Sequence, residues 1–80
     1  MNRCTVEFAI EPFSEGSPGP HVMAGIAAME TQGLSVSMGP FGSTVTGAVD
    51  EVSGAIGLMV AAAAQDGAER VLVEVVIDTT

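Results

Sequence analysis

The sequence predicts an α+β sandwich in which a four-stranded antiparallel sheet carries two helices on one face. Two observations favour this fold class. Apolar side chains recur every second residue in four segments, as in strands, and at helical spacing in two others. The order is strand, helix, strand, strand, helix, strand, and right-handed crossovers place both helices on the same side of the sheet. This βαββαβ arrangement is a ferredoxin-like sandwich, for which we expect the strand order 4-1-3-2.

The first strand is predicted over residues 5–11. Val6, Phe8 and Ile10 alternate there with polar or small residues, which is the pattern of a half-buried strand. Pro12 ends the strand because proline has no backbone N–H to donate to a neighbouring strand.

The first helix is predicted over residues 21–32, after a loop at residues 14–20 with the sequence SEGSPGP. Pro20 is compatible with the first turn of a helix, and Gly33 is a typical C-terminal stop. Gly25 lies inside the helix, where glycine costs about 1 kcal/mol relative to alanine. We therefore expect another part of the chain to pack closely against it.

A β-hairpin is predicted next, from strands at residues 34–38 and 43–47 around a Gly-Pro-Phe-Gly turn. The second helix is predicted over residues 49–65, and acidic side chains in its first turn favour the helix dipole. The last strand is predicted over residues 71–77. The expected buried stripe of the second helix comprises Val49, Val52, Ile56, Met59 and Ala63.

The length and composition predict a single domain over residues 1–80. Hydrophobic residues make up 48% of the chain and charged residues 15%, which favours a packed domain over disorder. A domain of this size buries only about 60% of the surface that its unfolded chain exposes, so oligomerisation is a common way to gain stability. Four methionines are expected to fill the core: Met23, Met29, Met38 and Met59.

The formal net charge of -8 argues against nucleic acid and membrane partners. Arg3 and Arg70 are the two basic residues, too few to neutralise phosphates or anionic lipids. The longest apolar run, residues 55–64, is half of the about 20 residues that a membrane span needs. A single cysteine, Cys4, predicts a free thiol and a cytoplasmic location.

One face of the predicted sheet has no helix over it, and we call it the open face. It mixes apolar side chains, hydroxyls and carboxylates, whereas a face exposed to water usually collects more charge. Two interpretations stay open: the hydroxyls enter a pocket or a subunit interface at modest desolvation cost, or they reflect strand propensity. By strand parity, the open face comprises Glu7, Ala9, Glu11, Ser35, Ser37, Thr44, Thr46, Leu72, Glu74 and Val76.

Three segments resemble a known family, the small thiamine-binding domains that also occur as a tandem repeat in a bacterial hydroxymethylpyrimidine/thiamine-binding protein. They are VEFAIEPFSEG at residues 6–16, GPFGSTVTGAVDEV at residues 39–52 and ERVLVEVVID at residues 69–78. The resemblance covers nearly the whole chain. It implies a ferredoxin-like, non-enzymatic binder of thiamine or its hydroxymethylpyrimidine part, assembled as a homodimer or homotetramer. Members often have glutamate before the glycine that corresponds to Gly47, and this chain has Thr46 there.

Candidate ligand contacts follow from the open face and the resemblance together. Hydroxyls and backbone groups supply the donors and acceptors that an aminopyrimidine needs, and carboxylates favour the cationic thiazolium. We predict no catalytic residue, metal or separate cofactor, and expect self-association through the open face. The candidate ligand-binding residues are Glu7, Ser37, Gly39, Pro40, Phe41, Thr44 and Thr46.

Two alternatives remain open: a regulatory amino-acid-binding module of the ACT type, which shares this topology, and a purely structural oligomerisation domain. An enzymatic function is less favoured, because His21 is the one histidine from which a Ser-His-Asp triad could be built. An acylphosphatase would need arginine in the loop at residues 14–20, which is acidic instead. An RNA-binding sheet would need aromatic side chains on its face and a basic surround.

Overall fold

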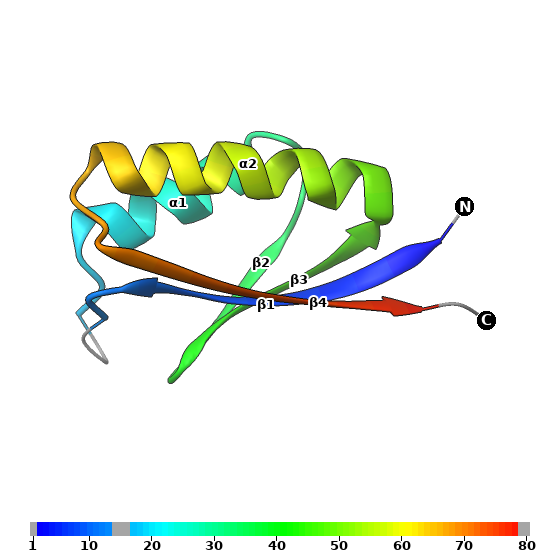
Figure 1. Ribbon diagram of the computed structural model, residues 1–80, viewed down its shortest axis with the longest axis horizontal. Coiled ribbons are helices and arrows are strands. Elements are labelled where there is room, and N and C mark those ends of the chain that lie inside the picture. The colour runs from blue at the N-terminus through cyan, green and yellow to red at the C-terminus, as the bar shows by residue number, and fades with distance from the viewer. Residues whose placement is uncertain (1, 14–16, 79–80) are drawn as a thin grey trace.

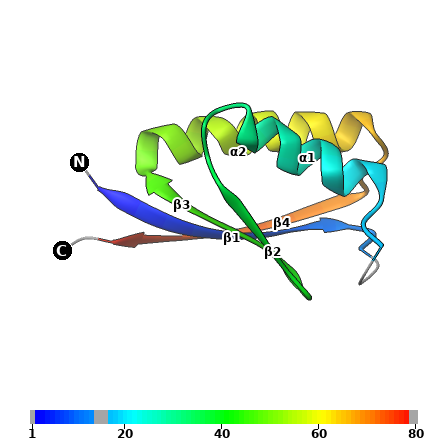
Figure 2. The same ribbon diagram turned by 180° about the vertical axis from the view of Figure 1, so that it is seen from behind.

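The computed structural model describes residues 2–13 and 17–78 and has the predicted βαββαβ order. It is a ferredoxin-like α+β sandwich, with both helices on one face of a four-stranded antiparallel sheet (Figures 1 and 2). The strand order is β2-β3-β1-β4, which is the predicted order read from the other edge. The elements are β1 (Arg3–Glu11), α1 (Pro20–Glu30), β2 (Val36–Gly39), β3 (Gly42–Ala48), α2 (Val49–Gln65) and β4 (Arg70–Asp78).

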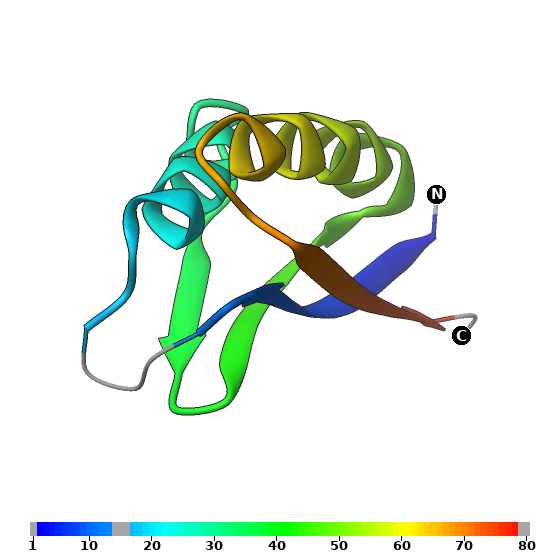
Figure 3. The same ribbon diagram turned by 60° about the vertical axis from the view of Figure 1, so that its left-hand side comes forward.

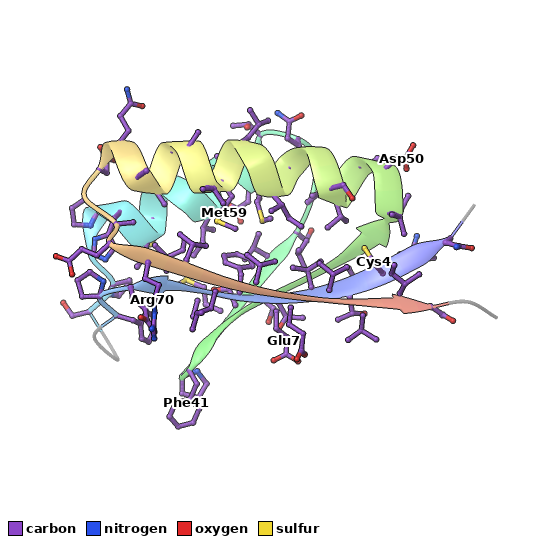
Figure 4. All side chains as sticks on the ribbon, viewed as in Figure 1. Cys4, Glu7, Phe41, Asp50, Met59 and Arg70 are labelled. Atoms are coloured by element: carbon purple, nitrogen blue, oxygen red, sulfur yellow. The ribbon has the colours of Figure 1, made fainter. Side chains whose placement is uncertain are left out.

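Strand β1 lies at the centre of the sheet, between β3 and β4. Its even-numbered side chains from Cys4 to Ile10 are buried against the helices, as the sequence alternation predicts. Figure 4 shows Cys4 and Met59 between the helices and the sheet, whereas Glu7 points away from the helices. Burial of these apolar side chains supplies the main favourable term in folding. The rest of the core comprises Val22, Ile26, Met29, Leu34, Val45, Val52, Ala55, Met59 and Ala63.

Gly25 of α1 allows the two helices and β1 to meet closely, as its position inside a helix predicts. A Cβ atom there would lie 2.5 Å from Ile10 Cδ1 and 3.3 Å from Met59 Cγ. A Cβ atom here would force the Ile10 side chain or the helix packing to shift, so glycine favours this close approach.

The second helix begins and ends at the predicted residues, Val49 and Gln65. The first helix is shorter than predicted, because it ends at Glu30 with Thr31 as its C-cap, and Gly33 has a positive φ just beyond it. The buried stripe of α2 includes Ala55, which the prediction omitted, while Val49 and Ile56 are half-buried.

The expectation that four methionines fill the core is wrong for two of them. Met29 and Met59 lie in the core, but Met23 and Met38 are exposed, because their positions on α1 and β2 lie outside the layer between helices and sheet. The side chains of β4 on the helix side are also exposed: Val73 by 38%, Val75 by 45% and Ile77 by 50%. Helix α1 packs mainly on β1 and β2, and α2 packs mainly on β1 and β3. The helix-side surface of β4 is therefore left largely uncovered (Figure 3).

Candidate functional site

A pocket of about 470 Å³ lies on the open face beside the β2–β3 hairpin. Its volume is in the range of about 300–1,000 Å³ that is typical of small-molecule sites. Strands β1, β3 and β4 and the hairpin turn all contribute to it. The lining residues are Glu7, Phe8, Ala9, Gly39, Pro40, Phe41, Gly42, Ser43, Thr44, Leu72, Val73 and Glu74.

A row of polar side chains crosses the open face at the level of the pocket. Ser37 pairs with Thr44 across β2 and β3, and Thr44 pairs with Glu7 across β3 and β1. Glu7 in turn pairs with Glu74 across β1 and β4. Because directly opposite residues of antiparallel strands share a face, the four side chains project from the same side of the sheet.

The hairpin turn is built from residues that allow close backbone approach. Gly39 pairs with Gly42, so Pro40 and Phe41 form a two-residue turn between them. A Cβ atom on Gly42 would lie 2.9 Å from the carbonyl oxygen of Phe8, and this residue has a φ of 157°. Glycine therefore lets the hairpin reach β1 at the edge of the pocket.

Phe41 lies at the tip of this turn and is 87% exposed. Figure 4 shows it on the side of the sheet away from the helices, which is also the side to which Glu7 points. An aromatic ring here has no packing role in the core, and it can cover a bound molecule or a neighbouring subunit.

The electrostatic character of the pocket comes from two carboxylates, Glu7 and Glu74. Among the described residues, neither has a basic partner. Arg70 instead pairs with Glu11 at 2.8 Å, at the far end of the β1–β4 ladder. The pocket is therefore negatively charged, and such a site attracts cations.

Five of the seven candidate ligand-binding residues line this pocket: Glu7, Gly39, Pro40, Phe41 and Thr44. Ser37 lies next to Thr44 on the edge strand but is outside the lining. Thr46 lies two residues further along β3, with its Oγ1 3.4 Å from Thr5 Oγ1. Leu72 was not a predicted ligand contact, although strand parity put it on the open face. Glu74 lines the pocket as one of the two open-face carboxylates expected to attract the thiazolium.

The single cysteine and the single histidine of the chain lie outside the pocket. Cys4 is a free, buried cysteine in the core. His21 is in the first turn of α1, and its Nε2 hydrogen-bonds the Pro12 carbonyl oxygen. Within residues 2–13 and 17–78, no group of three His, Cys, Asp or Glu side chains is placed to hold a metal ion. No helix in these ranges is both long and apolar enough to cross a membrane.

These features define a ferredoxin-like domain with a small-molecule pocket on its uncovered sheet face. The model of the thiamine-binding protein family matches residues 6–80, and the chain belongs to this family. No curated protein matches the chain.

Solved structures from several organisms have the same fold. A candidate thiamine biosynthesis/salvage protein from Thermotoga maritima has a TM-score of 0.69 and 23% identity, over 98% of this chain and 84% of its own. A hypothetical protein from Methanocaldococcus jannaschii has a TM-score of 0.72 and 23% identity, over 100% and 82%. A domain of unknown function, DUF77, from Bacillus cereus has a TM-score of 0.70 and 20% identity, over 98% and 76%. At these identities the similarity shows the fold.

Proposed function

We propose that this protein binds thiamine or its hydroxymethylpyrimidine part, without catalysing a reaction, in the open-face pocket beside the hairpin. The observation that carries the proposal is one pocket of suitable volume that combines Thr44 with Glu7 and Glu74, two carboxylates without a basic partner among the described residues. Membership of the thiamine-binding protein family supports the ligand class.

Each half of thiamine has a counterpart in the lining. The aminopyrimidine needs a donor and an acceptor close together, and the Thr44 hydroxyl supplies both alongside backbone groups of the hairpin. The thiazolium has a fixed positive charge, which Glu7 and Glu74 favour. The Phe41 ring can close over the ligand from the hairpin tip.

A binding role without catalysis is supported by the family, which is named for the binding of thiamine. The free thiol of Cys4 is consistent with the reducing cytoplasm, where we propose the protein acts.

Calorimetric titration of the purified chain with thiamine and with hydroxymethylpyrimidine tests the proposal. Saturable binding of either compound supports it. Binding of an amino acid in place of both would favour an ACT-type regulatory module. Thiamine, hydroxymethylpyrimidine and amino acids could all fail to give binding heat or a rise in Tm. That result would overturn the proposal and favour a purely structural oligomerisation domain.

We further propose that the open face is covered by another copy in a homodimer or homotetramer. Leu72 and Val76 are 49% and 59% exposed on this face, which supports an apolar contact there. Leu72→Asp would place an unpaired carboxylate in such a contact and should reduce the assembled mass measured by light scattering. An unchanged mass would contradict coverage of this face.

A further inference from the structure

The two arginines of the chain lie at opposite ends of the β1–β4 ladder. Arg3 begins β1 and is directly opposite Asp78, and Arg70 begins β4 and is directly opposite Glu11. Arg70 Nε donates a hydrogen bond to Glu11 Oε1 at 2.8 Å. The chain has no other arginine and no lysine. Each of its basic residues is therefore matched with an acidic residue of the neighbouring strand.

The pocket lies between these ends, at the cross-strand pair of Glu7 and Glu74. Glu7 is four residues from Arg3 along β1, and Glu74 is four residues from Arg70 along β4. At about 3.4 Å per residue, each separation is about 13 Å. This exceeds the Debye length of about 8 Å at physiological ionic strength, so the arginines do little to offset the negative charge of the pocket.

Backbone amides, which can bind phosphate without basic side chains, are also poorly placed at the pocket. Helix N-termini bind phosphate in many proteins, but both helices cover the opposite face of the sheet (Figures 1 and 2). The first turn of α2 also contains Asp50 and Glu51. The hairpin turn in the lining contains Pro40, which has no N–H and interrupts the run of successive amides that forms an anion-binding nest.

We propose that Glu7 and Glu74 make this pocket selective for thiamine that is not phosphorylated, and that they exclude its monophosphate and diphosphate esters. This inference rests on the proposed function, because it concerns the same site. The two glutamates attract the thiazolium and repel a phosphate group. They are therefore specificity-determining residues as well as ligand contacts.

The geometry of the row of polar side chains places the two glutamates near the group that is esterified. Thr44, Glu7 and Glu74 are opposite one another on three adjacent strands, so the row spans about 9–10 Å. With the aminopyrimidine at Thr44, the linked thiazolium lies over the glutamates. The hydroxyethyl group that becomes phosphorylated is attached to this second ring, so it is close to both carboxylates.

A hydroxyl and a phosphate differ in two ways at this position. A free hydroxyl donates a hydrogen bond to a carboxylate, whereas a fully ionised phosphate only accepts. A phosphate monoester also carries about -1.5 to -2 charges at pH 7, which more than cancels the single positive charge of the thiazolium. Phosphorylation therefore replaces a donor by a like charge beside two carboxylates.

The expected selectivity follows from the loss of this charge-assisted hydrogen bond. We expect the Kd of thiamine monophosphate to exceed that of thiamine by about tenfold to a hundredfold. The diphosphate carries more negative charge and should bind more weakly still. Added salt should reduce both ratios, because it screens the repulsion.

Calorimetric titration with thiamine and its two phosphate esters, in buffer containing EDTA, tests the selectivity. The chelator is needed because a divalent cation could bridge the diphosphate to the two carboxylates. The titrations are then repeated with Mg²⁺ in place of EDTA. Tight binding of the diphosphate that depends on Mg²⁺ and is lost in Glu74→Gln would overturn exclusion of the esters.

Two variants of Glu74 test the cause of the selectivity. Glu74→Gln should weaken thiamine binding and lower the ratio of the monophosphate and thiamine Kd values. Glu74→Lys should reverse the preference, and its opposite charge faces Glu7, which is a favourable cross-strand pair that helps to keep the sheet intact. Glu30→Gln is the matched control, because it removes the same charge from an exposed residue at the end of α1 and should leave the ratio unchanged.

The outcomes separate this inference from the proposed function. If thiamine binds and its esters bind as tightly in EDTA, the selectivity is overturned while the proposed function stands. If none of the three compounds binds, both are overturned. If the Glu74→Gln and Glu74→Lys proteins both keep the ratio of the parent, Glu74 does not determine the specificity.

Discussion

Glu7 of β1 and Glu74 of β4 are direct cross-strand partners on the open face, although both are acidic. Like charges in this position destabilise a sheet. Neither carboxylate has a basic partner among the residues that the structure describes. A fold that keeps two such groups side by side in a pocket has a local negative potential available for a cationic ligand.

Removing one of these charges should change stability and binding in opposite directions. We expect Glu7→Gln to raise the free energy of unfolding by about 0.2–1 kcal/mol, because the repulsion of Glu74 is relieved. The same change should weaken thiamine binding. Urea unfolding at fixed protein concentration and calorimetry measure the two effects. A protein that binds thiamine as tightly as the parent would show that Glu7 does not hold the cation.

Salt should weaken thiamine binding more than hydroxymethylpyrimidine binding. The Debye length falls from about 30 Å at 0.01 M to about 3 Å at 1 M ionic strength, which screens the attraction between the glutamates and the thiazolium. The pyrimidine alone lacks that fixed charge and is the internal control. Equal salt dependence of the two dissociation constants, measured by calorimetry, would argue against electrostatic capture of the cation.

The Thr44 hydroxyl should contribute directly to affinity. Thr44→Val nearly keeps the shape and strand propensity of the side chain, and loss of one hydrogen bond should cost about 0.5–1.5 kcal/mol of binding free energy. Thr5→Val is the matched control, because Thr5 projects from the same face outside the pocket lining. If both variants fold normally and bind with the affinity of the parent, the hydroxyl is not a ligand contact.

Phe41 offers an optical test of the pocket. The chain contains neither tryptophan nor tyrosine, so a tryptophan introduced at one position is the sole strong fluorophore. Phe41→Trp should change its emission on addition of thiamine, because the ring lies at the pocket wall. Met23→Trp, on the exposed surface of α1, should not. Matching responses of the two variants would point to a non-specific effect of the ligand.

Close packing at Gly25 should make alanine unfavourable there despite its better helix propensity. Gly25→Ala gains about 1 kcal/mol in propensity, but the added Cβ would lie 2.5 Å from Ile10 Cδ1 and overpack the core at a cost of about 1–3 kcal/mol. We expect a net loss in urea unfolding. Gly57→Ala in α2, where a Cβ would meet nothing within 4 Å, should instead stabilise the chain.

The sequence by itself determined the order of the elements and the central strand. Strict alternation from Val6 to Ile10 identified the buried face of β1, and the helical spacing after Ala48 gave α2 its observed bounds. These features are local: strand and helix periods differ, and glycine and proline mark where each ends. The Gly-Pro-Phe-Gly turn located the hairpin for the same reason.

Tertiary structure decided which faces are covered and which open-face residues form the pocket. Alternation predicts that Val73 and Val75 share a face with the core residues of β1, but only the lateral placement of the helices shows that this part of β4 is left bare. Thr44 and Thr46 have the same strand parity, yet Thr44 alone lines the pocket, because the hairpin turn and β4 meet β1 at its level. Local periodicity assigns a side chain to a face, whereas the position of that face relative to other elements depends on contacts between residues distant in sequence.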